Sequence, residues 1–317
     1  MNINKPVCPK CSSFREITLH LHELSKFCDL INDTRDVYKL LKKKVEICSE
    51  AKSASVAKWL MLASQLETVE MNTFRYEEAH VYCDPVADEL NSNSAHYSSF
   101  ATHITRFIFI SNALEEAYRL TSGLYEERYV LALKSGPKIK RQRSYSTQAA
   151  WLIDEVFSAI EFPDFYFHKV DALLEISSHY KTIFNVGFDV DLEKNREKSR
   201  GLSVVRNIRN HIAHAVFPIV ENPEFTWEFD DPRIKNMVIT LLLRACRVAT
   251  MNIQILLSIV HNEFKSQDYF YLSEDLDVGE EFQNVCTLQY LKNLHLEQSF
   301  GLNESSQWAW RSDVLEG

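Results

Sequence analysis

The chain has 317 residues, a formal net charge of −9 and a hydrophobic fraction of 45%, values that are ordinary for a globular protein with its own core. The negative charge excludes a general electrostatic attraction to nucleic acid, although it leaves room for a local basic site. Only seven glycines and eight prolines occur. Because long helices joined by few loops need little of either residue, the composition predicts an all-α protein.

The sequence predicts a cytoplasmic protein without a membrane anchor. Its amino terminus, MNINKPVCPKC, lacks the basic-then-apolar layout of a signal peptide. The most apolar run, residues 237–260, is long enough to span a bilayer, but it contains Arg244 and Arg247, and arginines are costly in hydrocarbon. We expect a buried helix there that also faces a second copy of the chain, because it is more apolar than one bundle face requires. Seven cysteines without a secretory signal indicate reduced thiols.

Two helices are expected near the amino terminus, followed by a domain boundary. Apolar residues recur at three- and four-residue steps over residues 19–31 and 56–66, which is typical of amphipathic helices. The polar segment at residues 88–99 predicts a break in the helical pattern. We therefore expect an N-terminal helical region over residues 1–92 and a main helical domain over residues 93–270.

The main domain is expected to contain five helices and one basic loop. A loop is indicated at residues 133–148 by the Gly136-Pro137 pair. A Pro163-Asp164 pair separates two helices, and Asp231 with Pro232 opens the last one. After residue 270 the sequence becomes acidic and mixed, which predicts a C-terminal appendage over residues 271–317. The five helices are expected over residues 100–122, 149–162 and 164–184, over the segment that precedes Pro218, and from Pro232 onward.

The segment GLSVVRNIRNHIAHAVFP, residues 201–218, contains two overlapping copies of the pattern Arg-Asn-x-x-x-His. The first copy runs from Arg206 to His211 and the second from Arg209 to His214. One interpretation is a basic helix end of the kind that the helix dipole favours, with Arg209 paired to a carboxylate. The other is an anion-binding site built from guanidinium, amide and imidazole groups.

A helical projection of this segment at about 100° per residue gives an apolar stripe with a polar line beside it. Arg209 falls inside the stripe. Since a guanidinium cannot be deprotonated, burying it requires a partner, and we expect a carboxylate from a neighbouring helix. The stripe consists of Leu202, Val205, Ile212 and Val216, and the polar line consists of Arg206, Asn210 and His214.

The second copy, RNHIAH at residues 209–214, resembles the Arg-Asn-x-x-Ala-His signature of the HEPN superfamily, whereas the first copy lacks the alanine. The resemblance implies an all-α multi-helix bundle of HEPN type, here with an additional N-terminal helical region. Members usually carry an acidic residue on an earlier helix that packs near the motif, and FISNALEEAYR is similar to that element. Glu115 is our choice for this residue, and Glu116 is the substitute.

Many members of the superfamily are metal-independent ribonucleases that work as homodimers. The resemblance therefore implies an endoribonuclease, plausible as a toxin or defence effector, with RNA as substrate, an inhibitory or triggering protein partner, and neither cofactor nor metal. His214 would transfer a proton near neutral pH, Arg209 would bind the phosphate oxygens, and Asn210 would orient His214 or bond the phosphate. One subset carries a tyrosine that a partner nucleotidyltransferase modifies. Val216 stands at that position, so this version is not expected.

Further basic residues are candidates for contact with the RNA backbone. They lie beside the motif and in the basic loop, and for the loop a solvated surface is the alternative. A rival function is a non-catalytic HEPN-like module that binds nucleotide or RNA, or only holds a dimer together. The candidate contacts are Arg206, His211, Lys138, Lys140, Arg141 and Arg143.

The CPKC sequence near the amino terminus is the one stretch with metal-site spacing. Cys8 and Cys11 have the spacing of half a zinc site, but no second Cys-x-x-Cys follows. Two free thiols in a mobile terminus are the alternative. The sequence alone therefore assigns no metal ligand.

Overall fold

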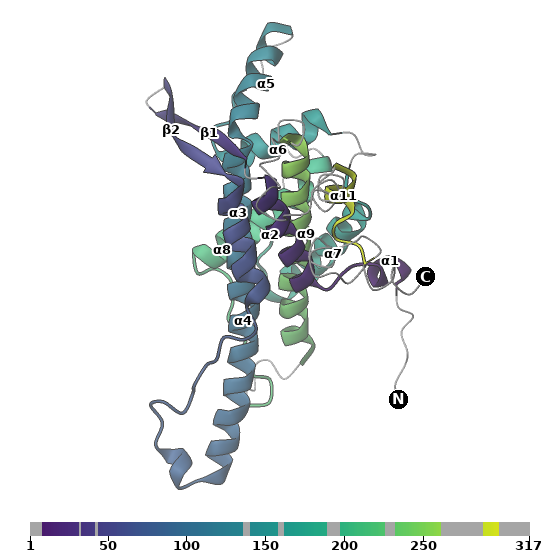
Figure 1. The fold of residues 1–317 in the computed structure, drawn as a ribbon. Helices are drawn as coiled ribbons and strands as arrows, with labels where there is room; N and C mark the ends of the chain where they lie inside the picture. Colours follow the sequence, from purple (N-terminus) through teal and green to yellow (C-terminus); the bar gives the residue numbers. More distant parts are fainter. Residues whose placement is uncertain are drawn as a thin grey trace, which may run out of the picture.

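The chain is mostly helical, with one small antiparallel sheet in the part that the structure describes (Figure 1). This confirms the expected helical class in its coarse form and adds two strands to it. The computed structural model describes residues 8–31, 33–41, 44–135, 140–157, 162–188, 197–225, 232–260 and 288–297.

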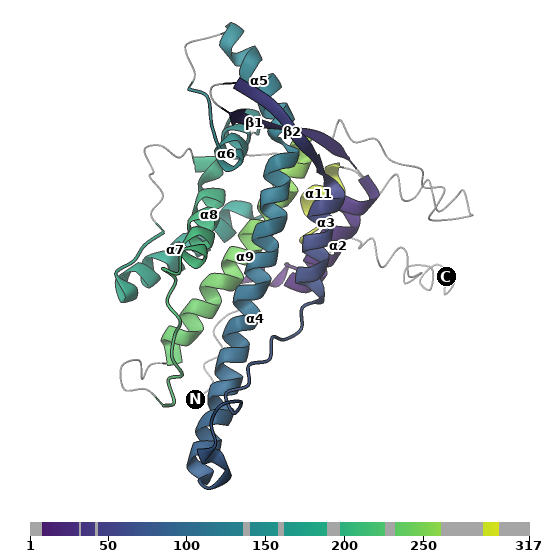
Figure 2. The ribbon, with the colours of Figure 1, turned by 90° about the vertical axis from the view of Figure 1, so that its left-hand side faces the viewer.

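The central helix of the fold is α9 (Pro232–Val260). It packs against α4 (Asp84–Leu120) on one side and against α7 (Tyr166–Phe184) and α8 (Arg200–Ala213) on the other (Figure 2). On its far side α4 also packs against α3 (Ser53–Gln65). The helix that carries the Arg–His motif therefore lies on one face of a helical core.

The N-terminal region contains the two expected helices and an unexpected hairpin. α2 (Ile17–Ile31) and α3 confirm the helices predicted over residues 19–31 and 56–66. Between them, β1 (Thr34–Leu41) pairs antiparallel with β2 (Lys44–Lys52), with an irregular register beside Val37. The strands were missed because neither of them buries one whole face against the core. Only Val37 and Ala51 of the hairpin are buried, so the sequence of the two strands lacks a strong alternation of apolar and polar residues.

The polar segment at residues 88–99 is helical, so the expected break is wrong. α4 continues through it, and the expected boundary at residues 92–93 falls inside this helix. The polar residues have a packing role instead, because a row of hydroxyls along α4 binds the extended segment that follows α3. The hydroxyls of Ser94, Ser98 and Thr102 accept hydrogen bonds of 3.3, 2.9 and 2.8 Å from the backbone N–H groups of Thr73, Met71 and Val69.

The helices α6 to α9 follow the predicted order, with shifted ends, whereas α5 was not predicted and its last residues fall in the expected loop. α6 begins at Tyr145, inside the expected loop, because Ser144 and Thr147 form a capping box. Pro232 is the first residue of α9, as expected, whereas Asp231 lies outside the described residues. The other elements are α1 (Pro9–Ser12), η1 (Ala79–Val81), α5 (Ser122–Ser135), α6 (Tyr145–Val156), η3 (Glu197–Ser199) and α11 (Leu288–Asn293).

Part of the expected C-terminal appendage docks on the core. Leu291 and Leu294 are buried. The backbone N–H of Arg15 donates to the carbonyl of His295 at 3.0 Å, so the segment before α2 and the segment after α11 pair with each other. Within residues 271–317, only 288–297 are described.

The apolar run of α9 is covered by the chain itself. α9 is the one described helix that is long and apolar enough to cross a membrane, yet 72% of its most apolar stretch is buried. Arg244 donates to the carbonyl of Ala172, and Arg247 contacts His20 Nδ1 at 2.7 Å. The expected buried helix is therefore confirmed. Its apolar surface is used within one chain, however, so it gives no argument for a dimer.

Candidate functional site

The first turns of α8 are held tightly against α7 and α9. Leu202, Val205 and Ile208 are buried there. Gly201 permits the close approach, since a Cβ on this residue would lie 2.6 Å from Val170 Cγ2 and 2.7 Å from the Tyr166 hydroxyl. The close packing of the first turns of α8 against α7 and α9 therefore fixes the position of the motif further along the same helix.

The end of α8 forms a Schellman motif without glycine. The N–H of Val216 donates to the carbonyl of His211 at 2.8 Å, and the N–H of Ala215 donates to Ile212 at 3.2 Å. Ala215 has a φ of 54°, a left-handed conformation that glycine normally occupies and that strains other residues. The helix ends at Ala213, and His214 is its exposed C-cap residue.

Arg209 lies at the edge of the helix face and not inside it. Its Nη2 is 3.9 Å from Glu115 Oε1 on α4, with 40% and 33% of the two side chains exposed. Its Nη1 also donates to Asn210 Oδ1 at 3.4 Å. The expected apolar stripe is therefore wrong at its far end, because the helix stops at Ala213 and Val216 is 49% exposed. A half-exposed pair of this kind contributes about 0–1 kcal/mol.

The structure distinguishes between the two candidate acidic residues. Glu115 is the one that approaches Arg209. Glu116 instead pairs with Arg119 at 3.2 Å, one turn further along the same helix. Because α4 presents these neighbours on different faces, only Glu115 can orient the guanidinium of the second motif copy.

Tyr118, which the sequence analysis did not select, lies three residues after Glu115 on α4. Its hydroxyl is buried and has no hydrogen-bond partner among the residues that the structure describes. Burial raises the pKa of Tyr118 well above its ordinary value; the charge of Glu115 raises it further, and Arg206 and Arg209 oppose the rise. The phenol is therefore within electrostatic reach of both motif arginines. A tyrosine at helical spacing is a common core residue, so the sequence alone gave no signal for it.

The two histidines of the motif differ in environment. The ring of His211 packs on Phe188 with centroids 4.8 Å apart, and its Nδ1 is buried without a hydrogen-bond partner in the described part of the chain. Burial lowers the pKa of His211. His214 is exposed beyond the last turn. Of the two imidazoles, His214 is thus the more accessible to a large ligand.

The basic loop contributes fewer free cations than its sequence indicates. Lys138 lies outside the described residues, and Lys140 and Arg143 are exposed. Arg141 forms an ion pair with Glu126 of α5 and lies over a tyrosine ring. The described part of the loop contacts α5, where the N–H of Gln142 donates to the Tyr125 hydroxyl at 2.7 Å.

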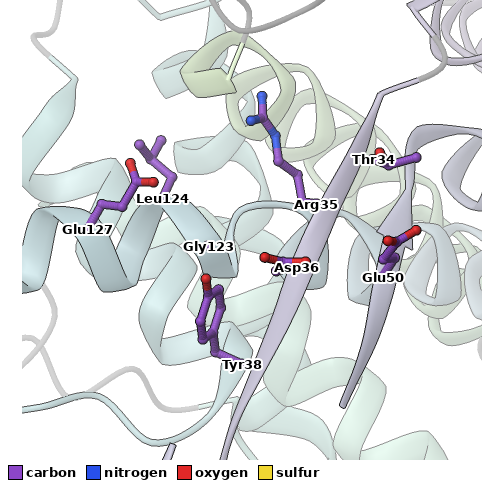
Figure 3. A pocket seen from close by; sticks show the side chains of 8 residues that line it. All are labelled: Thr34, Arg35, Asp36, Tyr38, Glu50, Gly123, Leu124 and Glu127. Atoms are coloured by element: carbon purple, nitrogen blue, oxygen red, sulfur yellow. The ribbon is translucent and has the colours of Figure 1, made fainter. Parts of the chain in front are cut away.

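A separate polar pocket of about 210 Å³ lies between the hairpin and α5 (Figure 3). Its charged lining residues are Arg35, Asp36, Glu50 and Glu127. Three carboxylates against one guanidinium disfavour a phosphate ligand. None of the residues that line this pocket belongs to the motif, so it is not an extension of the α8 site.

Comparisons with known proteins found no matching family model, no similar curated protein and no similar solved structure. The interpretation of the α8 site therefore depends on its residues and geometry, together with the resemblance of its motif.

Proposed function

We propose that this chain is a metal-independent endoribonuclease of HEPN type, cytoplasmic and active as a homodimer. The observation that carries the proposal is the arrangement at the end of α8. Arg209 and Asn210 lie near the end of α8, His214 is its exposed C-cap residue, and Glu115 of α4 approaches Arg209 to 3.9 Å. A guanidinium and an accessible imidazole at the same helix end match the needs of RNA cleavage by the neighbouring 2′-hydroxyl.

In the proposed reaction the 2′-oxygen attacks the adjacent phosphorus and the 5′-oxygen leaves. The base accepts the 2′-hydroxyl proton, and an acid returns a proton to the leaving oxygen. His214 serves in one of these transfers. Arg209 donates to the phosphate oxygens as negative charge grows on them. Glu115 and Asn210 hold the guanidinium in place, since both contact it.

A homodimer would complete this scheme. One histidine can perform one of the two proton transfers at a time, and a second copy of the motif across a dimer cleft would supply the other. RNA contacts from Arg206, three residues before Arg209 on α8, would hold the backbone. Regulation as a toxin or defence effector, through an inhibitory or triggering partner, belongs to the same proposal.

The alternative is a non-catalytic HEPN-like module that binds nucleotide or RNA or holds a dimer. The contacts of Arg209 favour this alternative. Its guanidinium already has Glu115 and Asn210 as partners, and so requires no ligand. The two functions differ in whether RNA that binds is also cut.

Incubation of the purified full-length chain with total RNA in EDTA separates them. The proposal predicts cleavage that leaves 2′,3′-cyclic phosphate ends and that stops when the 2′-hydroxyl is replaced by hydrogen. RNA binding without cleavage would favour the alternative. Cleavage of a 2′-deoxy substrate at an equal rate would contradict the mechanism. Light scattering that shows an active monomer would contradict the dimer.

A further inference from the structure

The CPKC sequence of α1 lies against α7, far from the α8 site (Figure 1). Cys8 Sγ is 3.8 Å from His168 Nε2, and Cys11 Sγ is 3.5 Å from the same nitrogen. All three ligand atoms lie within 4.8 Å of one another. Residues separated by 160 and 157 positions thus meet through their metal-ligating atoms.

We propose that Cys8, Cys11 and His168 bind a zinc ion. In a tetrahedral site with Zn–S near 2.3 Å and Zn–N near 2.0–2.1 Å, sulfur and nitrogen ligands lie about 3.6 Å apart. The two observed Sγ–Nε2 distances, 3.8 and 3.5 Å, bracket this value. Two thiolates and one imidazole in tetrahedral geometry select zinc over the harder divalent cations, and the described residues supply three of the four ligands.

The cysteines are placed by a folded turn and not by a mobile terminus. Cys8 is the N-cap of α1, and its carbonyl accepts hydrogen bonds from Cys11 N at 2.9 Å and from Ser12 N at 3.0 Å. Directly after α1, the carbonyl of Ser13 accepts a bond of 3.0 Å from Glu297 N, and Phe14 is 8% exposed. The segment that carries the thiols is therefore docked on the core.

The surroundings include a contact that can orient one of the proposed ligands. Lys169, the residue after His168 on α7, has its Nζ 3.4 Å from Cys11 Sγ. Partners of this kind beside a metal ligand fix its orientation.

The bound ion would fasten the amino-terminal segment to the start of α7. The N-cap residue of α7, Phe165, has a φ of 61°, a conformation that is rare for a large side chain, and its ring lies 6.2 Å from that of Phe14. Zinc at this junction would stabilise the contact between the two segments. This role is structural and does not depend on the function proposed for α8.

The test is the zinc content and Co²⁺ spectrum of the full-length chain. We expect one zinc per chain, and a thiolate charge-transfer band when Co²⁺ replaces it. Cys11→Ser and His168→Ala should each weaken zinc binding at least about tenfold. His168→Cys should retain the ion, since a thiolate can replace the imidazole. Two matched controls, Cys83→Ser and His179→Ala, change exposed residues outside the site and should bind zinc as the wild type does.

Three outcomes would overturn the proposal. The first is a chain that binds no stoichiometric zinc under reducing conditions. The second is equal zinc affinity in the wild type and Cys11→Ser. The third is a Co²⁺ spectrum that His168→Ala leaves unchanged, which would mean that α7 supplies no ligand. Circular dichroism of each variant, recorded without metal, separates a lost ligand from a failure to fold.

Discussion

Gly201→Ala tests how α8 is seated in the core. A Cβ at this position would lie 2.6 Å from Val170 Cγ2, 2.7 Å from the Tyr166 hydroxyl and 3.1 Å from Val248 Cγ1. The first two contacts are too close for any real side chain, so α8 or its neighbours must move. The Tyr166 hydroxyl cannot move freely, because it donates to Asn252 Oδ1 at 3.1 Å in the buried interface with α9.

The expected cost follows from two opposing effects. Overpacking of a close-packed core costs about 1–3 kcal/mol, whereas replacing a helical glycine by alanine recovers about 0.5–1 kcal/mol. We therefore expect Gly201→Ala to lower the free energy of unfolding by about 1–2 kcal/mol. The displaced helix would also change the contact between Arg209 and Glu115, which at 3.9 Å is already long.

The chain offers a matched control in Gly123, near the start of α5. A Cβ there would lie 3.6 Å from Asp36 O and 3.6 Å from Tyr38 Cε2, which is ordinary contact. Gly123→Ala should therefore stabilise the protein by about 0.4–1 kcal/mol. Urea denaturation followed by circular dichroism measures both variants. If the two alanine variants are equally stable, the close packing of α8 against α7 and α9 is refuted.

Three further predictions concern stability. Burial lowers the pKa of His295 to about 4 and also lowers the pKa of His20. The unfolded chain therefore binds more protons below pH 6.5, so the free energy of unfolding is full above that pH and falls as the pH drops toward 4, by about 3 kcal/mol for His295 alone. A urea midpoint that stays constant from pH 7 to 4.5 would contradict this. Tyr118→Phe removes a buried hydroxyl for which the described residues offer no hydrogen-bond partner, so thermal unfolding should show unchanged or higher stability, by up to about 1 kcal/mol. A clear loss of stability would mean that the hydroxyl is bonded. Ala215→Gly relieves a φ of 54° and should raise the free energy of unfolding by about 0.5–1 kcal/mol, which a lowered urea midpoint would rule out.

The parts of the fold that were predictable have strong local signals. α2, α7 and α9 carry a regular apolar period, and Pro232 marks the start of α9. The hairpin was not predictable, because its strands bury little. The polar half of α4 was not predictable either, since its hydroxyls bond to a segment that precedes it by more than 20 residues, as Ser94 does with Thr73.

The sequence supplies candidate residues for the site but not their geometry. The pattern at residues 209–214 proposes Arg209 and His214 by resemblance, and Glu115 by its place on the earlier helix. The helical projection could not show that α8 ends at Ala213, because alanine occupies the left-handed C′ position where glycine would have signalled the end. No local pattern could bring His168 to CPKC, since that contact depends on the packing of α1 against α7.

The most direct test of the central claim is the rate of RNA cleavage in EDTA by four forms of the full-length chain. The wild type should cleave, His214→Ala should be slower by at least about a hundredfold, and His179→Ala, which removes an exposed histidine from α7, should match the wild type. The cleavage rate of Arg209→Lys should fall by a similar factor, because lysine keeps the positive charge but lacks the two parallel N–H donors of the guanidinium. Equal cleavage by the wild type and His214→Ala would contradict the account.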